Sequence, residues 1–244
     1  SFGLSGFTFW SHDAGGFVGK ASEDLYLRWL AFSSLTSHSR CHGMAPKEPW
    51  HYSPEFMNRF RKIVEIRYRL MPYLWAQAHD RSARGLPMLR SLFLEFPEDT
   101  GAWKVDDEYL LGSSMLVAPL MHEGATKRDV YLPAGDWIDY QTGKTYQGGW
   151  HEIQAADLPV VVLVRDGSVI PHIGLAQSTS RMDWSKLELA VFAKDPSKAE
   201  GLVALPDSKE SIRIQLAADG DTWKQAPNPF EGKVTWETSL ASKP

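Results

Sequence analysis

The stretch from Trp10 to Phe17 brings a carboxylate, aromatic side chains and paired glycines together. Residues 4–10 are mostly apolar and aromatic, which predicts a buried strand, and His12 and Asp13 follow where it ends. Parallel β/α folds gather their reactive groups at that end of their strands. A carboxylate that bonds hydroxyl groups, next to an aromatic ring that stacks on a flat sugar face, is typical of a carbohydrate site. An aspartate that only caps the following turn is the structural alternative.

Two strand–helix units are predicted before residue 86. The first helix begins at the N-cap Ser22, carries acidic residues in its first turn, and ends near Ser34. Residues 36–41 form the second predicted strand, which runs into His42.

The second helix is longer and has clear signals at both ends. Ser53-Pro54-Glu55 combines a cap, a proline at the first helical position and an early acid. Pro72 is expected to kink this helix, and Gly85 to close it.

From Pro87 onward the apolar pattern alternates, and turn signals come about every ten residues, which is typical of antiparallel β structure. Turns are expected at residues 133–135, 142–143 and 166–167, and the acidic residues 106–108 indicate a solvated helix start. Strands are predicted at residues 88–96, 115–118, 129–132, 137–140, 150–153, 158–164, 168–170, 187–193, 211–216 and 234–238.

Composition excludes several classes of protein. The chain has 244 residues, of which 43% are hydrophobic and 23% charged, as in an ordinary globular protein. No apolar run reaches the ~20 residues that cross a bilayer, and a net charge of −4 argues against a general nucleic-acid binder. The single cysteine, Cys41, excludes an internal disulfide. No ligand cluster has metal-binding spacing, so neither a metal nor another cofactor is expected.

Two β/α units cannot close a parallel barrel, which needs about eight strands, and left open they would expose their edges. We therefore expect an α/β plus all-β chain that is the tail of a longer protein. It would hold the last two β/α units of a (β/α)8 barrel, followed by C-terminal antiparallel β-sandwich domains.

Several sequence blocks resemble glycoside hydrolase family 31, the retaining α-glucosidases and α-xylosidases. They occur in the family's order, and the first two look most like the bacterial α-xylosidases. The blocks are residues 6–17, 37–43 with 48–50, 71–74, 87–90 with 95–97, and 111–119, so that the resemblance covers roughly residues 1–170.

The resemblance implies roles for individual side chains. Asp13 and His42 correspond to barrel residues that hydrogen-bond hydroxyls of the sugar in the −1 subsite, and Phe17 to an aromatic residue near the +1 subsite. For His42 by itself, a structural hydrogen bond is the alternative. Arg40 either orients the site or forms half of a buried ion pair, and the ion pair is the favoured interpretation. Trp10 is expected in the barrel wall.

No catalytic residue is expected in this segment. A retaining glycosidase needs two carboxylates about 5–5.5 Å apart, and the family carries both upstream of the strand that opens this chain. Asp13 occupies a binding position, and no second carboxylate stands near it in sequence. The resemblance thus implies part of an exo-acting retaining enzyme that cleaves terminal α-xylosyl or α-glucosyl residues, inactive as this segment alone.

The expected parts are residues 1–85, the end of the catalytic barrel; 86–171, a proximal β-sandwich; and 172–244, a distal β-rich domain that need not be complete. The expected partners are an oligosaccharide or small glycoside substrate and the upstream barrel segment, with no nucleic acid and no membrane. Oligomeric state is open, a homo-oligomer included, and so is the compartment, with a slight preference for the cytoplasm. Two alternatives stand: a stand-alone carbohydrate-binding or β-sandwich interaction module, and a subunit that completes its barrel with a separate polypeptide.

Overall fold

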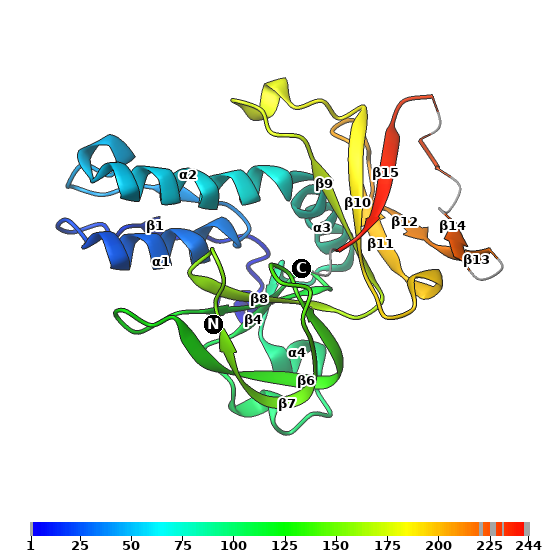
Figure 1. Cartoon of the computed structure of the whole chain (residues 1–244), viewed down its shortest axis with the longest axis horizontal. Coiled ribbons are helices and arrows are strands. Elements are labelled where there is room, and N and C mark those ends of the chain that lie inside the picture. The colour runs from blue at the N-terminus through cyan, green and yellow to red at the C-terminus, as the bar shows by residue number, and fades with distance from the viewer. Residues whose placement is uncertain (1, 220–221, 225–227, 231, 242–244) are drawn as a thin grey trace.

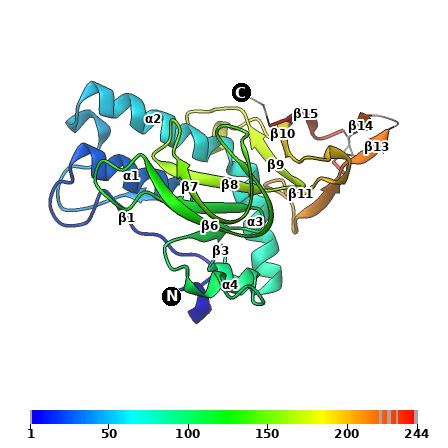
Figure 2. The same ribbon diagram turned by 60° about the horizontal axis from the view of Figure 1, so that its bottom comes forward.

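Helices pack on one face of a six-stranded sheet, and a five-stranded sheet lies beside them (Figure 1). This computed structural model describes residues 2–219, 222–224, 228–230 and 232–241. The residues near the N-terminus lie beside helix α4 (Leu92–Glu95), as Figure 2 shows. Gly3 and Leu4 share a cavity with Phe93 of that helix.

The predicted helices are confirmed, with their caps. Helix α1 spans Glu23–Ser34, and the Ser22 hydroxyl accepts a hydrogen bond from the Leu25 amide at 3.3 Å. Helix α2 spans Pro54–Arg69, with Ser53 capping the Phe56 amide at 3.1 Å. Helices α1 and α2 lie side by side in both views.

Pro72 breaks the long helix that the sequence predicts. Proline has no N–H to donate, so the helical ladder is interrupted. The chain forms α2 and then α3 (Met71–Arg84), with Leu70 between them. Gly85 closes α3 with a left-handed backbone, φ 67°.

The buried strand predicted at residues 4–10 is wrong. A short 3-10 helix, η1 (Gly3–Ser5), begins the described chain, and Phe7 and Phe9 are exposed. A strand needs neighbours for its backbone hydrogen bonds, and this segment pairs with no strand among the described residues. The strand predicted at 36–41 is shorter, because only β2 (Arg40–Cys41) pairs, with β1 (Asp13–Ala14).

The six-stranded sheet is antiparallel throughout. Along β8, alternate side chains face two cores: Val162 and Val164 pack with the helices, whereas Val161 and Leu163 pack on the opposite face. In spatial order the strands are β3 (Leu89–Arg90), β4 (Tyr109–Leu111), β5 (Met115–Pro119), β8 (Val160–Arg165), β6 (Lys127–Asp139) and β7 (Thr145–Gln154).

Three local predictions in this sheet are wrong. Residues 88–96 form β3 and then α4, because β3 pairs with β4 only as far as Arg90. Residues 133–135 do not end a strand, because β6 passes through them with a register shift. The acidic residues 106–108 precede strand β4, not a helix, and Glu108 is buried.

The five-stranded sheet is mixed, although antiparallel pairing was expected. Strand β11 runs parallel to β9, and β15 runs parallel to β10. Its order is β12 (Ile212–Gln215), β11 (Glu200–Val203), β9 (Ser168–Ile173), β10 (Lys186–Phe192) and β15 (Thr235–Leu240). Strands β13 (Ala217–Asp219) and β14 (Thr222–Lys224) form a separate pair. Residues 220–221, 225–227, 231 and 242–244 of the predicted distal domain lie outside the described residues.

Candidate functional site

The parallel pair β1–β2 brings the two sequence motifs together. Asp13 is in register with Arg40, and Ala14 with Cys41. Because parallel strands end at the same edge, the segments that carry Phe17 and His42 both leave from that edge. Helix α1 connects the two strands and packs Tyr26 in the same core as Ala14 of β1.

Arg40 holds the carboxylate of Asp13. Its Nε donates to Asp13 Oδ1 at 2.6 Å, and its Nη2 lies 2.6 Å from the same oxygen. An ion pair was expected here, but not an exposed one: the Arg40 side chain is 61% exposed and that of Asp13 is 21% exposed. The pair fixes the carboxylate in place and leaves it open to solvent.

Phe17 and His42 lie next to each other beyond the strand ends. Their ring centroids are 5.7 Å apart with the planes tilted by 43°. Both residues are exposed. They therefore offer an aromatic face and an imidazole beyond the ends of the strands that carry Asp13 and Arg40.

A buried lysine, which the sequence interpretation missed, fixes the turn that carries Phe17. Lys47 is only 5% exposed, and its Nζ donates to the carbonyl oxygens of Gly15 at 2.9 Å and Gly19 at 2.8 Å. The Met44 amide also donates to the Phe17 carbonyl at 2.7 Å. No local pattern marks Lys47, because its acceptors lie about 30 residues away in the chain.

Gly15 is required by its surroundings. Its φ is +82°, and a Cβ there would lie 2.8 Å from the ring of Tyr26. Tyr26 is fully buried and donates to the Lys47 carbonyl at 2.8 Å. The glycine turn, the tyrosine and the lysine thus form one support beneath Phe17.

Trp10 is half-buried and tied to the second motif by Ser37. The Ser37 hydroxyl accepts from the Trp10 amide at 2.9 Å and donates to the Trp10 carbonyl at 2.6 Å. These bonds substitute for strand pairing in this segment. No contact recorded among the described residues joins Trp10 directly to Asp13, Phe17 or His42.

His12, beside Asp13, is held in its neutral form. Its ring stacks on Phe32 with centroids 4.5 Å apart, and Trp29 Nε1 donates to its Nδ1 at 2.7 Å. Burial lowers the pKa of His12, and the nearby Asp13 only partly offsets this. Because Nδ1 accepts a hydrogen bond, the proton of the neutral ring lies on Nε2. That buried atom has no partner among the described residues.

Chemically, the site offers hydrogen-bond acceptors and donors around an aromatic face. A fixed carboxylate can accept from two hydroxyl groups, an imidazole can donate or accept, and Phe17 can stack on an apolar ring face. Among the described residues, no group of three or more His, Cys, Asp or Glu is placed to hold a metal ion. No described helix is both long and apolar enough to cross a membrane.

The described residues form one β/α unit, β1–α1–β2, which is followed by helices and by two large β sheets. Two family descriptions match: "Glycosyl hydrolases family 31 TIM-barrel domain" over residues 1–77, and "Glycosyl hydrolase family 31 C-terminal domain" over residues 85–170. The chain belongs to glycoside hydrolase family 31.

Individual relatives agree with this assignment. The α-xylosidase XylQ of Lactiplantibacillus pentosus is 42% identical over 179 residues, which are 70% of this chain and 23% of that protein. An α-xylosidase of Emericella nidulans is 37% identical over 233 residues, 91% of this chain and 30% of that protein. The chain thus spans about a quarter of the length of its curated relatives.

Solved structures show the same fold. The α-xylosidase of Xanthomonas citri superposes with a TM-score of 0.82 at 27% identity, over 99% of this chain and 30% of that one. A dextranase of Flavobacterium johnsoniae, complexed with glucose, has a TM-score of 0.80 at 31% identity, over 88% of this chain and 29% of that one.

Proposed function

We propose that this chain is the C-terminal part of a retaining, exo-acting α-glycosidase that cleaves terminal α-xylosyl or α-glucosyl residues. The observation that carries the proposal is the parallel pair β1–β2, with Asp13 fixed by Arg40 at its open edge and Phe17 beside His42 just beyond. Relatives of the chain include α-xylosidases and an α-glucosidase.

Within this enzyme, each side chain has a distinct task. Asp13 and His42 bond hydroxyls of the −1 sugar, and Phe17 contacts the group in the +1 subsite. Arg40 orients Asp13, and Trp10 forms part of the barrel wall. The partial exposure of the Asp13 side chain, 21%, and the exposure of Phe17, 49%, support these roles.

The nucleophile and the acid/base carboxylate are supplied by barrel strands upstream of this chain, so the chain alone is inactive. Exposed apolar side chains near the N-terminus support this proposal, because an upstream barrel segment would cover them. Leu4 is 55% exposed, Phe7 54% and Phe9 43%. Soluble proteins rarely leave such a group uncovered. Self-association into a homo-oligomer is the competing way to cover it.

The chain divides into residues 1–85, the end of the barrel; 86–171, the proximal β domain; and 172–244, the distal β domain. Strand β9 (Ser168–Ile173) belongs to the five-stranded sheet, crosses the second boundary, and follows directly after β8 of the six-stranded sheet. The substrate is an oligosaccharide or a small glycoside.

The test compares the 244-residue chain with the complete gene product that carries it. Both are assayed on p-nitrophenyl α-xyloside and α-glucoside, with sedimentation velocity to record self-association. The complete product should turn over at least one glycoside, and the chain alone neither. Comparable turnover by the chain alone, or none by the complete product, would contradict the proposal.

A further inference from the structure

A small polar cavity of about 200 Å³ lies where helix α3 meets the first residues of β9 and β11. It is far along the chain from the strand pair β1–β2. Four of its lining residues are arginines, Arg81, Arg84, Arg165 and Arg213, and Ser113 and Ser114 also line it.

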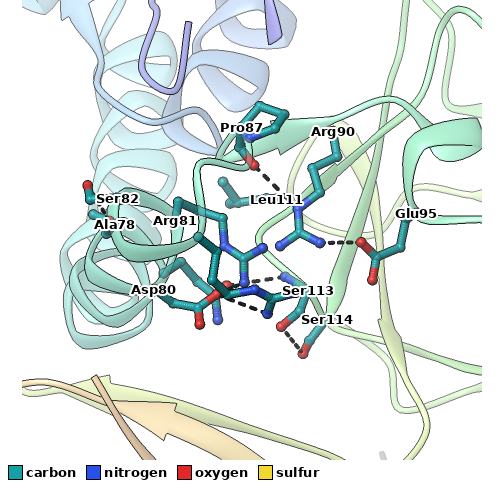
Figure 3. Close-up of polar contacts among 12 residues, drawn as sticks. Ala78, Asp80, Arg81, Ser82, Pro87, Arg90, Glu95, Leu111, Ser113 and Ser114 are labelled. Carbon is teal, nitrogen blue, oxygen red and sulfur yellow. Dashed lines mark hydrogen bonds and ion pairs between the residues drawn. The ribbon is translucent and has the colours of Figure 1, made fainter. Parts of the chain in front are cut away.

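Arg81 is the most unusual of these side chains, because it is fully buried. Its Nη2 is ion-paired with Oδ2 of the neighbouring Asp80, whereas its Nε and Nη1 have no hydrogen-bond acceptor among the described residues. The same Asp80 oxygen lies 3.6 Å from Arg84 Nη1. Figure 3 shows Asp80 and Arg81 facing Ser113 and Ser114. Buried donors without acceptors lower stability, so a ligand that supplies acceptors to this guanidinium would stabilise the fold.

The arginines around Arg81 are also incompletely bonded. Arg90 pairs through Nη1 with Glu95, but its buried Nη2 has no acceptor among the described residues (Figure 3). Arg165 reaches Glu95 only at 3.5 Å, and its Nε has no described acceptor. Burial lowers the pKa of Arg165, yet arginine stays cationic at neutral pH.

The lining is positively charged overall. Against its four arginines stand two lining carboxylates, Asp166 and Glu200, and the adjacent Asp80. Glu200 is paired with Arg213 and Asp80 with Arg81, which leaves one arginine charge in excess. A metal cation would be repelled here. A neutral sugar would leave the excess charge uncompensated. An oxyanion brings both negative charge and oxygens that only accept, which is what free guanidinium N–H groups and serine hydroxyls need.

We propose that this cavity binds a small tetrahedral oxyanion, a phosphate group, between Arg81, Arg84 and Arg165 with the Ser113 and Ser114 hydroxyls as further donors. Bound there, the anion joins helix α3 to the starts of β9 and β11 and stabilises the contact between the helices and the five-stranded sheet. The proposal does not depend on the glycosidase activity.

The test is isothermal titration of the 244-residue chain with potassium phosphate, against potassium chloride at equal pH and ionic strength. One phosphate should bind per chain, with a matching rise in the thermal midpoint. Arg81→Gln should weaken binding about tenfold or more, because it removes a buried charge-assisted donor. Arg61→Gln, an exposed control on α2, should leave it unchanged.

Arg84→Gln keeps the test decisive if Arg81→Gln fails to fold. The Arg84 side chain is 53% exposed, so its loss should spare the fold and weaken phosphate binding about threefold. Glucose 1-phosphate serves as a second ligand: tighter binding than inorganic phosphate assigns the site to a phosphate ester, and weaker binding assigns it to the free ion. The proposal is overturned if wild type shows no saturable binding beyond chloride, or if the arginine variants that fold bind phosphate as wild type does.

Discussion

Replacing Lys47 by Met removes the ammonium group that bonds the carbonyls of Gly15 and Gly19. A hydrogen bond to a charged group contributes about 1.5–3 kcal/mol. The Gly15 carbonyl belongs to a buried residue and stays without its donor, whereas Gly19 is exposed and can bond water instead. Because Met also avoids the cost of burying a charge, the expected net loss is about 2 kcal/mol, mainly from Gly15.

Urea unfolding of the 244-residue chain measures this loss, and trypsin reports on the turn itself. Lys20 is exposed directly after the turn, so Lys47→Met should speed cleavage after Lys20 as well as lower the unfolding free energy. The control is Lys62→Met on α2, where the lysine is 66% exposed and 3.9 Å from Asp157. Exposed ion pairs contribute little, so this change should stay within about 0.5 kcal/mol. If Lys47→Met matches the control in both measurements, Lys47 does not hold the turn.

Further substitutions test the packing and the buried titrating groups. In thermal unfolding, Gly15→Ala should lower stability by about 3 kcal/mol, because φ is positive and the new Cβ would meet the ring of Tyr26. Gly19→Ala should lower stability by only about 1 kcal/mol, because φ is also positive but the space around it is open. Equal losses would refute the packing argument. Burial lowers the pKa of His172 to about 4. Between pH 6.5 and 4 the unfolded chain therefore binds a proton at this residue that the folded chain does not bind, and the free energy of unfolding decreases as pH falls below 6.5. Burial raises the pKa of Glu108 to about 7. Between pH 4.5 and 7 the folded chain therefore holds a proton that the unfolded chain releases, and the free energy of unfolding decreases as pH rises above 4.5. Relative to wild type between pH 4.5 and 6.5, His172→Gln should therefore lose stability as pH rises and Glu108→Gln as pH falls, each by up to about 3 kcal/mol; parallel urea-unfolding curves would contradict both assignments.

Helices could be predicted from the sequence because their signals are local. The caps at Ser22 and Ser53 and the effect of Pro72 depend on neighbours a few residues away. The structure has both caps, and where a kink was predicted at Pro72 the helix divides into α2 and α3. The strand at residues 4–10 failed for the opposite reason. Its apolar pattern is real, but a strand also needs partners, and this segment has none among the described residues.

The β region shows the same limit. Residues 133–135 look like a turn, yet β6 continues because β7 pairs with it on both sides of the register shift. The acids at 106–108 look solvated, yet Glu108 is buried and accepts from the Tyr131 amide at 2.9 Å. Both outcomes depend on strands that lie distant in the sequence.

The candidate site was only partly readable from sequence. The motifs around Asp13 and His42 could be identified by their residue types and by family resemblance. The direct bond between Asp13 and Arg40 required the register of β1 with β2. Lys47 could not be identified at all, because a lysine in a loop is usually solvated, and only the folded turn shows what it bonds.

The proposed role of Asp13 is to bind the substrate sugar of an α-glycosidase. The decisive measurement is kcat/KM of the complete gene product and its Asp13→Ala variant on p-nitrophenyl α-xyloside and α-glucoside. Loss of the carboxylate should lower kcat/KM about 100-fold, equivalent to about 2.7 kcal/mol. Asp157→Ala, whose side chain is 88% exposed, should have no effect. An Asp13→Ala enzyme with unchanged kcat/KM on both glycosides would contradict the claim.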